Sequence, residues 1–126
     1  KKEKIIEWII RIGISGEFLG HGIFALQLKP RFIEMLTAFI GVTGELANTL
    51  LTLIGITDII VAILVLFYPM RVILIWASLW GFLTALARPI AGDPIWDFIE
   101  RWANWAAPLA LLYLKGIPKK IKDLFT

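Results

Sequence analysis

The chain of 126 residues contains no cysteine and one histidine. This excludes disulfides, thiol redox chemistry, cysteine-ligated iron–sulfur or zinc centres, and bis-histidine haem ligation within one chain. Hydrophobic residues make up 59% of the chain and the mean hydropathy is +0.80, whereas soluble domains contain roughly 45–50% apolar residues. The net charge of +3 comes with lysines gathered at the two chain ends. That placement is typical of membrane-flanking charge and argues against a nucleic-acid partner. We therefore expect residues 1–126 to form one integral membrane domain whose main partner is the lipid bilayer.

In chain order, the sequence predicts membrane-spanning helices over residues 5–28, 44–67, 71–88 and 95–114, because each stretch is apolar and about long enough to cross a bilayer. Between the first two, apolar residues recur every three or four positions over residues 31–41, and polar residues lie on the opposite face. This pattern predicts a short amphipathic helix at the membrane surface. The predicted fold class is all-α: a four-helix transmembrane bundle with a short interfacial helix between helices 1 and 2.

The charges predict how the bundle is oriented. Four spans place both termini on one side of the membrane, together with the terminal lysines and Arg71. Because basic residues gather on the cytoplasmic side, both termini are predicted to be cytoplasmic, with the protein in a prokaryotic inner (cytoplasmic) membrane. Arg11 lies close enough to the start of its helix to extend its charge toward the headgroups.

The first predicted helix carries unusual polar residues. Glu17 and His21 are four residues apart, so they lie one turn apart on the same face. Gly13, Gly16 and Gly20 leave room on or beside that face for another helix. A carboxylate in hydrocarbon needs a partner, a proton or a function. The spacing does not match the Glu-x-x-His repeat of di-iron bundles, so no metal site is predicted.

Depths estimated from the helical rise place polar residues of all four helices in one layer that opens to the outer side. Within this layer we predict that Arg101 is the counter-charge of Glu17, although Arg101 could instead be neutralised by Asp97, one turn away. Two meanings remain open: a ligand pocket, or a polar network that only fixes helix packing. The candidate ligand-binding residues are Glu17, His21, Asp58, Trp76, Trp80, Arg88, Arg101 and Asn104.

Several short motifs are spread along the chain: Arg11-x-Gly13, His21-Gly22, Phe39-Ile40-Gly41-Val42, Ile54-Gly55-Ile56-Thr57-Asp58-Ile59 and Pro69-Met70-Arg71. Together they resemble the DoxX-type membrane proteins, the family that includes the small subunit of archaeal thiosulfate:quinone oxidoreductase. Asp58 stands where the family usually has glutamate, and residues 88–94 depart from the general pattern. The resemblance implies a four-helix membrane fold and a link to quinone or sulfur redox chemistry.

Together these features predict an accessory or ligand-binding subunit of a respiratory or redox membrane assembly, with a polar intramembrane pocket for a quinone or lipid-like ligand. The expected partners are other membrane subunits or further copies in a homo-oligomer. No complete catalytic constellation is present, and the chain holds no cofactor motif of its own, so a redox role would need a partner subunit or a bound quinone. The alternatives are a small proton-coupled transporter and a purely structural membrane subunit.

Overall fold

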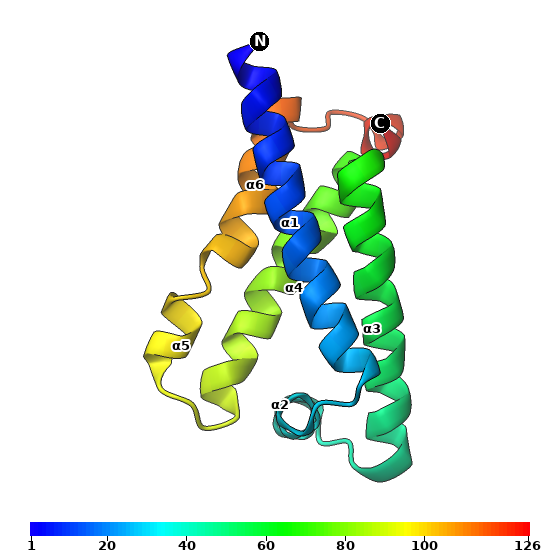
Figure 1. The fold of residues 1–126 in the computed structure, drawn as a ribbon, viewed down its shortest axis with the longest axis vertical. Helices are drawn as coiled ribbons and strands as arrows, with labels where there is room; N and C mark the ends of the chain where they lie inside the picture. Colours follow the sequence, from blue (N-terminus) through cyan, green and yellow to red (C-terminus); the bar gives the residue numbers. More distant parts are fainter.

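The computed structural model describes all 126 residues, and every regular element in it is a helix. Figure 1 shows both termini at one end of the molecule, here called the terminal end, and a short helix lying across the opposite end, here called the α2 end. In chain order the elements are α1 (Lys2–Leu26), α2 (Pro30–Ile40), α3 (Gly44–Phe67), α4 (Arg71–Ile90), α5 (Ile95–Ile99), α6 (Ala103–Lys115) and the 3-10 helix η1 (Ile121–Phe125).

Three helices, α1, α3 and α4, are long and apolar enough to cross a membrane, judged by length and composition. They lie where the first three membrane helices are predicted, which confirms the all-α class and supports a membrane protein. The short helix between the first two is also present as α2. Proline is well suited to the first turn of a helix and glycine to its left-handed C-cap. Pro30 accordingly begins α2, and Gly41, with φ of 77°, ends it.

The prediction of one continuous helix over residues 95–114 is wrong. The chain instead forms α5, a turn at residues 100–102, and α6. In the turn, the N–H groups of Arg101, Trp102 and Asn104 each bond to a carbonyl three residues back, so the chain is wound more tightly than in an α-helix. With 13 residues, α6 rises only about 20 Å, which is less than the roughly 30 Å of a bilayer core.

The helices form two antiparallel hairpins, α1 with α3 and α4 with α6 (Figure 1). At the terminal end an arginine closes the first hairpin. Arg11 on α1 is only 8% exposed and donates from Nε to the Val65 carbonyl, at 3.2 Å, and from Nη2 to the Leu66 carbonyl. Its guanidinium also lies 3.8 Å from the centre of the Trp8 ring. Arg11 therefore turns inward and caps the C-terminus of α3, instead of extending toward the headgroups.

The second hairpin repeats this arrangement. Arg71, at the start of α4, donates to the carbonyls of Lys115 at 2.7 Å and Gly116 at 2.6 Å, where α6 ends. In each hairpin a serine that follows the arginine on the same helix adds a further hydrogen bond to the returning helix. Ser15 Oγ donates to the Ala62 carbonyl at 2.9 Å, and Ser78 Oγ donates to the Trp105 carbonyl at 3.0 Å. Both hairpins are thus joined by side-chain donors that reach the backbone of the returning helix.

The closest helix contacts do not involve the glycines singled out from the sequence. A Cβ added at Gly13, Gly16 or Gly20 would meet nothing within 4 Å, so no helix of this chain packs against them. Gly22 of α1 and Gly55 of α3 are instead in mutual backbone contact. The α4–α6 crossing depends on Gly81, where an added Cβ would lie 2.3 Å from the Asn104 carbonyl oxygen.

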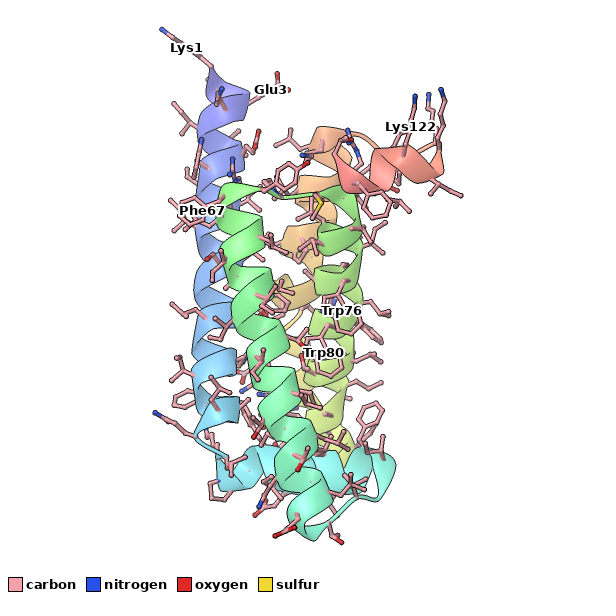
Figure 2. The ribbon with its side chains drawn as sticks, turned by 90° about the vertical axis from the view of Figure 1, so that its right-hand side faces the viewer. Lys1, Glu3, Phe67, Trp76, Trp80 and Lys122 are labelled. Carbon is pink, nitrogen blue, oxygen red and sulfur yellow. The ribbon has the colours of Figure 1, made fainter.

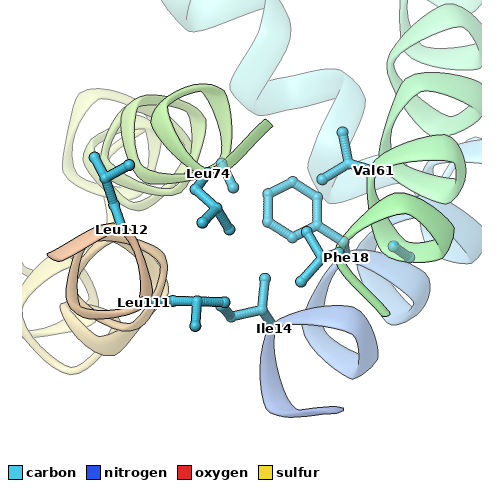
Figure 3. Packing of buried hydrophobic residues seen from close by; sticks show 9 residues of the cluster. Ile14, Phe18, Val61, Leu74, Leu111 and Leu112 are labelled. Atoms are coloured by element: carbon cyan, nitrogen blue, oxygen red, sulfur yellow. The ribbon is translucent and has the colours of Figure 1, made fainter. Parts of the chain in front are cut away.

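The hydrophobic core joins the two hairpins in the half nearer the termini. Side chains from four helices meet there, and Figure 3 shows Phe18 directed between α1, α3 and α4. The cluster comprises Ile14, Phe18, Val61, Ala62, Val65, Leu74, Ala77, Leu111 and Leu112. The other half of the bundle, toward α2, is not filled in this way, and the candidate site lies there.

Candidate ligand cavity

A cavity of about 430 Å³ lies between α1, α2, α3 and α4. Of its 22 lining residues, 15 are hydrophobic, so an occupant would be in contact mainly with apolar surface. Phe18 belongs both to the core and to the cavity lining, and therefore separates the two. The hydrophobic walls and the few charged groups among them are typical of sites for small lipophilic molecules.

Six of the eight candidate residues line this cavity: Glu17, His21, Asp58, Trp76, Trp80 and Arg88. Arg101 and Asn104 do not. Arg101 forms an ion pair with Glu100 at 2.9 Å and donates to the Asp97 carbonyl at 2.8 Å. The predicted Glu17–Arg101 ion pair is therefore wrong, and Arg101 contacts the backbone of Asp97 instead of its carboxylate. Asn104 lies at the α4–α6 crossing, where its backbone faces Gly81.

Two acidic side chains line the part of the cavity farther from α2, here called the deep end. Asp58 is only 4% exposed, and its Oδ1 atom is buried with no hydrogen-bond partner. Glu17 lies close enough to Asp58 for the two carboxylates to repel each other. The ion pairs of the protein are Arg11–Glu7, Arg31–Glu34, Arg31–Asp93 and Arg101–Glu100. Neither Glu17 nor Asp58 takes part in one, so both acids face the cavity without a cation.

Trp76 and Trp80 form one wall of the cavity. They are one turn apart on α4, and their rings stack with centroids 5.4 Å apart and an interplanar angle of 11°. Figure 2 shows the pair between α3 and α4. The indole of Trp80 lies beside the Asp58 carboxyl group. The two rings therefore place a flat aromatic surface next to an acid whose Oδ1 atom has no hydrogen-bond partner.

Basic groups lie toward the α2 end of the same cavity. Arg88 is 8% exposed, donates to the Thr84 carbonyl at 2.7 Å, and has no acidic partner. Its guanidinium lies 5.8 Å from the centre of the Phe32 ring. His21 packs edge-on against the same ring with centroids 6.1 Å apart. The acidic and basic groups of the cavity are thus separated, with the two acids farther from α2 and the basic side chains nearer to it.

Helix α2 forms one side of the cavity, which helical periodicity alone does not predict. It contributes the lining residues Phe32, Met35, Leu36, Phe39 and Ile40. Arg31 holds the start of α2 by donating to the Asp93 carboxylate and the Ala91 carbonyl beyond α4, while also bonding Glu34 at 2.7 Å. The bond to Glu34, with the nearby charge of Asp93, raises the pKa of the Arg31 guanidinium, so this link stays charged at any physiological pH.

Replacing Arg31 by glutamine should loosen α2. The hydrogen bonds that join this helix to the loop after α4 are those of Arg31, so their loss should increase amide hydrogen exchange severalfold over residues 33–40. Hydrogen–deuterium exchange mass spectrometry in detergent measures this. Glu34→Gln is the matched control, because it leaves the Arg31–Asp93 link in place. Equal exchange in both variants would contradict this role of Arg31.

No three His, Cys, Asp or Glu side chains are grouped so that they could hold a metal ion.

Comparisons of the chain with protein-family models, with curated proteins and with solved structures found no match.

Proposed function

We propose that this chain is an integral membrane protein that binds a quinone or lipid-like molecule in the cavity between α1 and α4. The observation that carries the proposal is the cavity itself, which has a volume of about 430 Å³ and a largely hydrophobic lining that includes Asp58, whose buried Oδ1 atom has no hydrogen-bond partner. Ligand sites in proteins occupy roughly 300–1,000 Å³ and combine apolar walls with a few placed polar groups.

The proposed arrangement in the membrane has four crossings. Helices α1, α3 and α4 each span the bilayer, and α5, the turn and α6 together make the fourth crossing. The terminal end carries most of the lysines, and Figure 2 shows Lys1 and Lys122 there. By the positive-inside rule this end is cytoplasmic, in a prokaryotic inner membrane. Helix α2 then lies at the outer surface and covers the cavity.

The proposed setting is a respiratory or redox assembly, in which this chain acts as an accessory, ligand-binding subunit. The resemblance to DoxX-type proteins supports this setting. With no cysteine and one histidine, the chain would contribute the binding site, and its partner subunits the electron carriers. Further copies of the chain in a homo-oligomer are the other proposed partners, and they would not supply electron carriers.

Filling the cavity should abolish ligand binding. Leu83 lines the cavity from α4, so Leu83→Trp should place an indole in the space that a ligand would use. Isothermal titration calorimetry with decylubiquinone in detergent micelles should show saturable binding to the wild-type protein and none to the variant.

Leu79→Trp is the matched control for this experiment. Leu79 lies one turn earlier on the same helix and is exposed on its surface, outside the cavity lining. This variant should bind the quinone as the wild type does. Equal binding by all three proteins would show that decylubiquinone partitions onto the lipid-facing surface, and would overturn the proposal.

A further inference from the structure

We propose that the deep end of the cavity selects ligands that carry a hydrogen-bond donor, such as the hydroxyl of a hydroquinone, phenol or alcohol. Asp58 and Glu17 would receive that donor. The acceptor-only form of the same ring, a quinone or an aryl ether, would bind less tightly. This inference rests on the proposed function and adds the chemical class of the ligand's polar end.

The first argument is the state of Asp58. Its Oδ1 atom is buried without a hydrogen bond, and leaving a buried acceptor unsatisfied costs free energy. Native proteins rarely leave such a group without a partner. Because Asp58 lines the cavity, the missing donor can come from an occupant. An occupant with a hydroxyl group would supply it, whereas a quinone oxygen can only accept.

The second argument is that Glu17 adds a further acceptor nearby, while no cation pairs with either acid. Ionised carboxylates only accept hydrogen bonds. Even with one proton shared between them, the two groups keep more acceptor than donor positions. The deep end therefore disfavours a carbonyl or ether oxygen and favours a hydroxyl.

The third argument is that the charged donors of the cavity lie elsewhere. Arg88 is eight residues beyond Trp80 on α4, which is about 12 Å along the helix. Its guanidinium and the His21 ring both pack against Phe32 near α2. An acceptor-only group would find a charged donor there, whereas the indole N–H of Trp80 beside Asp58 is already directed at that carboxyl group. The Trp80 ring also stacks on Trp76, so an aromatic ring carrying a hydroxyl fits the deep end both by its flat face and by its donor.

Three probes test this inference: tetramethylhydroquinone, its oxidised form tetramethylquinone, which is nearly equal in size and shape, and its dimethyl ether, which has no O–H donor and is larger by two methyl groups. Calorimetric titrations are done anaerobically, with dithiothreitol in the hydroquinone titrations, a reductant that modifies no residue here because the chain has no cysteine. The wild-type protein should bind the hydroquinone at least about tenfold more tightly than either other probe, as expected when a buried acceptor without a hydrogen bond gains one. Equal affinities for the three probes would overturn the inference.

Asp58→Asn sharpens the test, because the amide keeps the side-chain shape and adds an N–H donor. This variant should lose most of the preference for the hydroquinone. Asp97→Asn, outside the cavity, should keep it. If Asp58→Asn keeps the full preference, Asp58 is not the receiving group and the inference fails.

Leu83→Trp distinguishes the proposed ligand cavity from the proposed preference for donors. Probes that bind this variant normally would overturn the cavity as the binding site. A lack of preference in the wild type would overturn only the donor selection.

Discussion

Replacing Arg11 by methionine should destabilise the protein by about 2 kcal/mol or more, because hydrogen bonds from a charged donor to backbone carbonyls are lost. The helix cannot replace them. The amide that would normally bond the Val65 carbonyl belongs to residue 69, which is proline and has no N–H. The amide that would bond Leu66 belongs to Met70, and it bonds Tyr68 instead. The unfolding midpoint in mixed dodecylmaltoside and dodecylsulfate micelles, followed by circular dichroism, measures the change.

Lys4→Met is the control for this substitution. It removes one positive charge from the same helix at an exposed position with no hydrogen bond to the rest of the fold, so it should leave the midpoint almost unchanged. Arg11→Lys should fall between the two, because one ammonium group cannot reproduce the planar fork that reaches two carbonyls. If Arg11→Met is as stable as Lys4→Met, Arg11 is not a cap of α3.

The long helices could be predicted closely because length and composition determine them. The predicted span 44–67 coincides with α3, and the span 71–88 differs from α4 by two residues at its end. Each is a long apolar run that ends at turn-forming residues, such as Tyr68-Pro69 after α3. Within a membrane no other regular structure except a closed barrel satisfies the backbone, so a run of this kind has few alternatives.

The break at residues 100–102 could not be predicted, because no glycine or proline marks it. Its hydrogen bonds are local, yet the direction that α6 takes after the turn is set by contact with α4 at Gly81. A one-dimensional pattern does not contain that contact. The same limit explains why the predicted Glu17–Arg101 ion pair is wrong. The prediction places Arg101 along a straight helix, whereas the break puts it in a turn, where it pairs with Glu100.

The cavity was predicted in part. Helical rise fixes the height of a residue, which is why Glu17, His21 and Asp58 were expected in one layer and do line one cavity. Rise alone does not fix which neighbour a side chain faces. The sequence predicts an apolar face on α2 without naming what that face contacts, and in the structure Phe32, Met35 and Leu36 line the cavity. Amphipathic periodicity predicts that a helix has an apolar face, and only tertiary structure shows what that face covers.

The two halves of the bundle differ in packing, and this difference makes room for the cavity. In the half near the termini, the core side chains of four helices fill the centre, and Arg11 and Arg71 fix the ends of α3 and α6. Toward α2, the close Gly22–Gly55 contact holds α1 against α3, and α4 lies across the cavity from them. The densely packed half therefore positions the walls of the cavity.

The α4–α6 contact at Gly81 gives the second large prediction: Gly81→Ala should destabilise the protein by about 1–3 kcal/mol, the usual cost of overpacking. Glycine to alanine within a helix otherwise stabilises by up to about 1 kcal/mol, so the expected sign is reversed here. The cause is the Asn104 carbonyl, whose oxygen would lie 2.3 Å from the new Cβ and whose carbon would lie 2.7 Å away. Backbone atoms cannot rotate away as a side chain can.

The position of Asn104 is itself set by the sequence, which makes relief of this clash costly. Its carbonyl has no helical partner, because residue 108 is a buried proline without an N–H, and the oxygen instead rests against the Gly81 backbone. Moving α6 outward would also stretch the Ser78–Trp105 hydrogen bond of 3.0 Å. Gly16→Ala is the matched control, since its Cβ would meet nothing within 4 Å. In the same micelle titration Gly16→Ala should raise the unfolding midpoint or leave it unchanged, and a Gly81→Ala midpoint at or above that of the wild type would refute the close α4–α6 crossing.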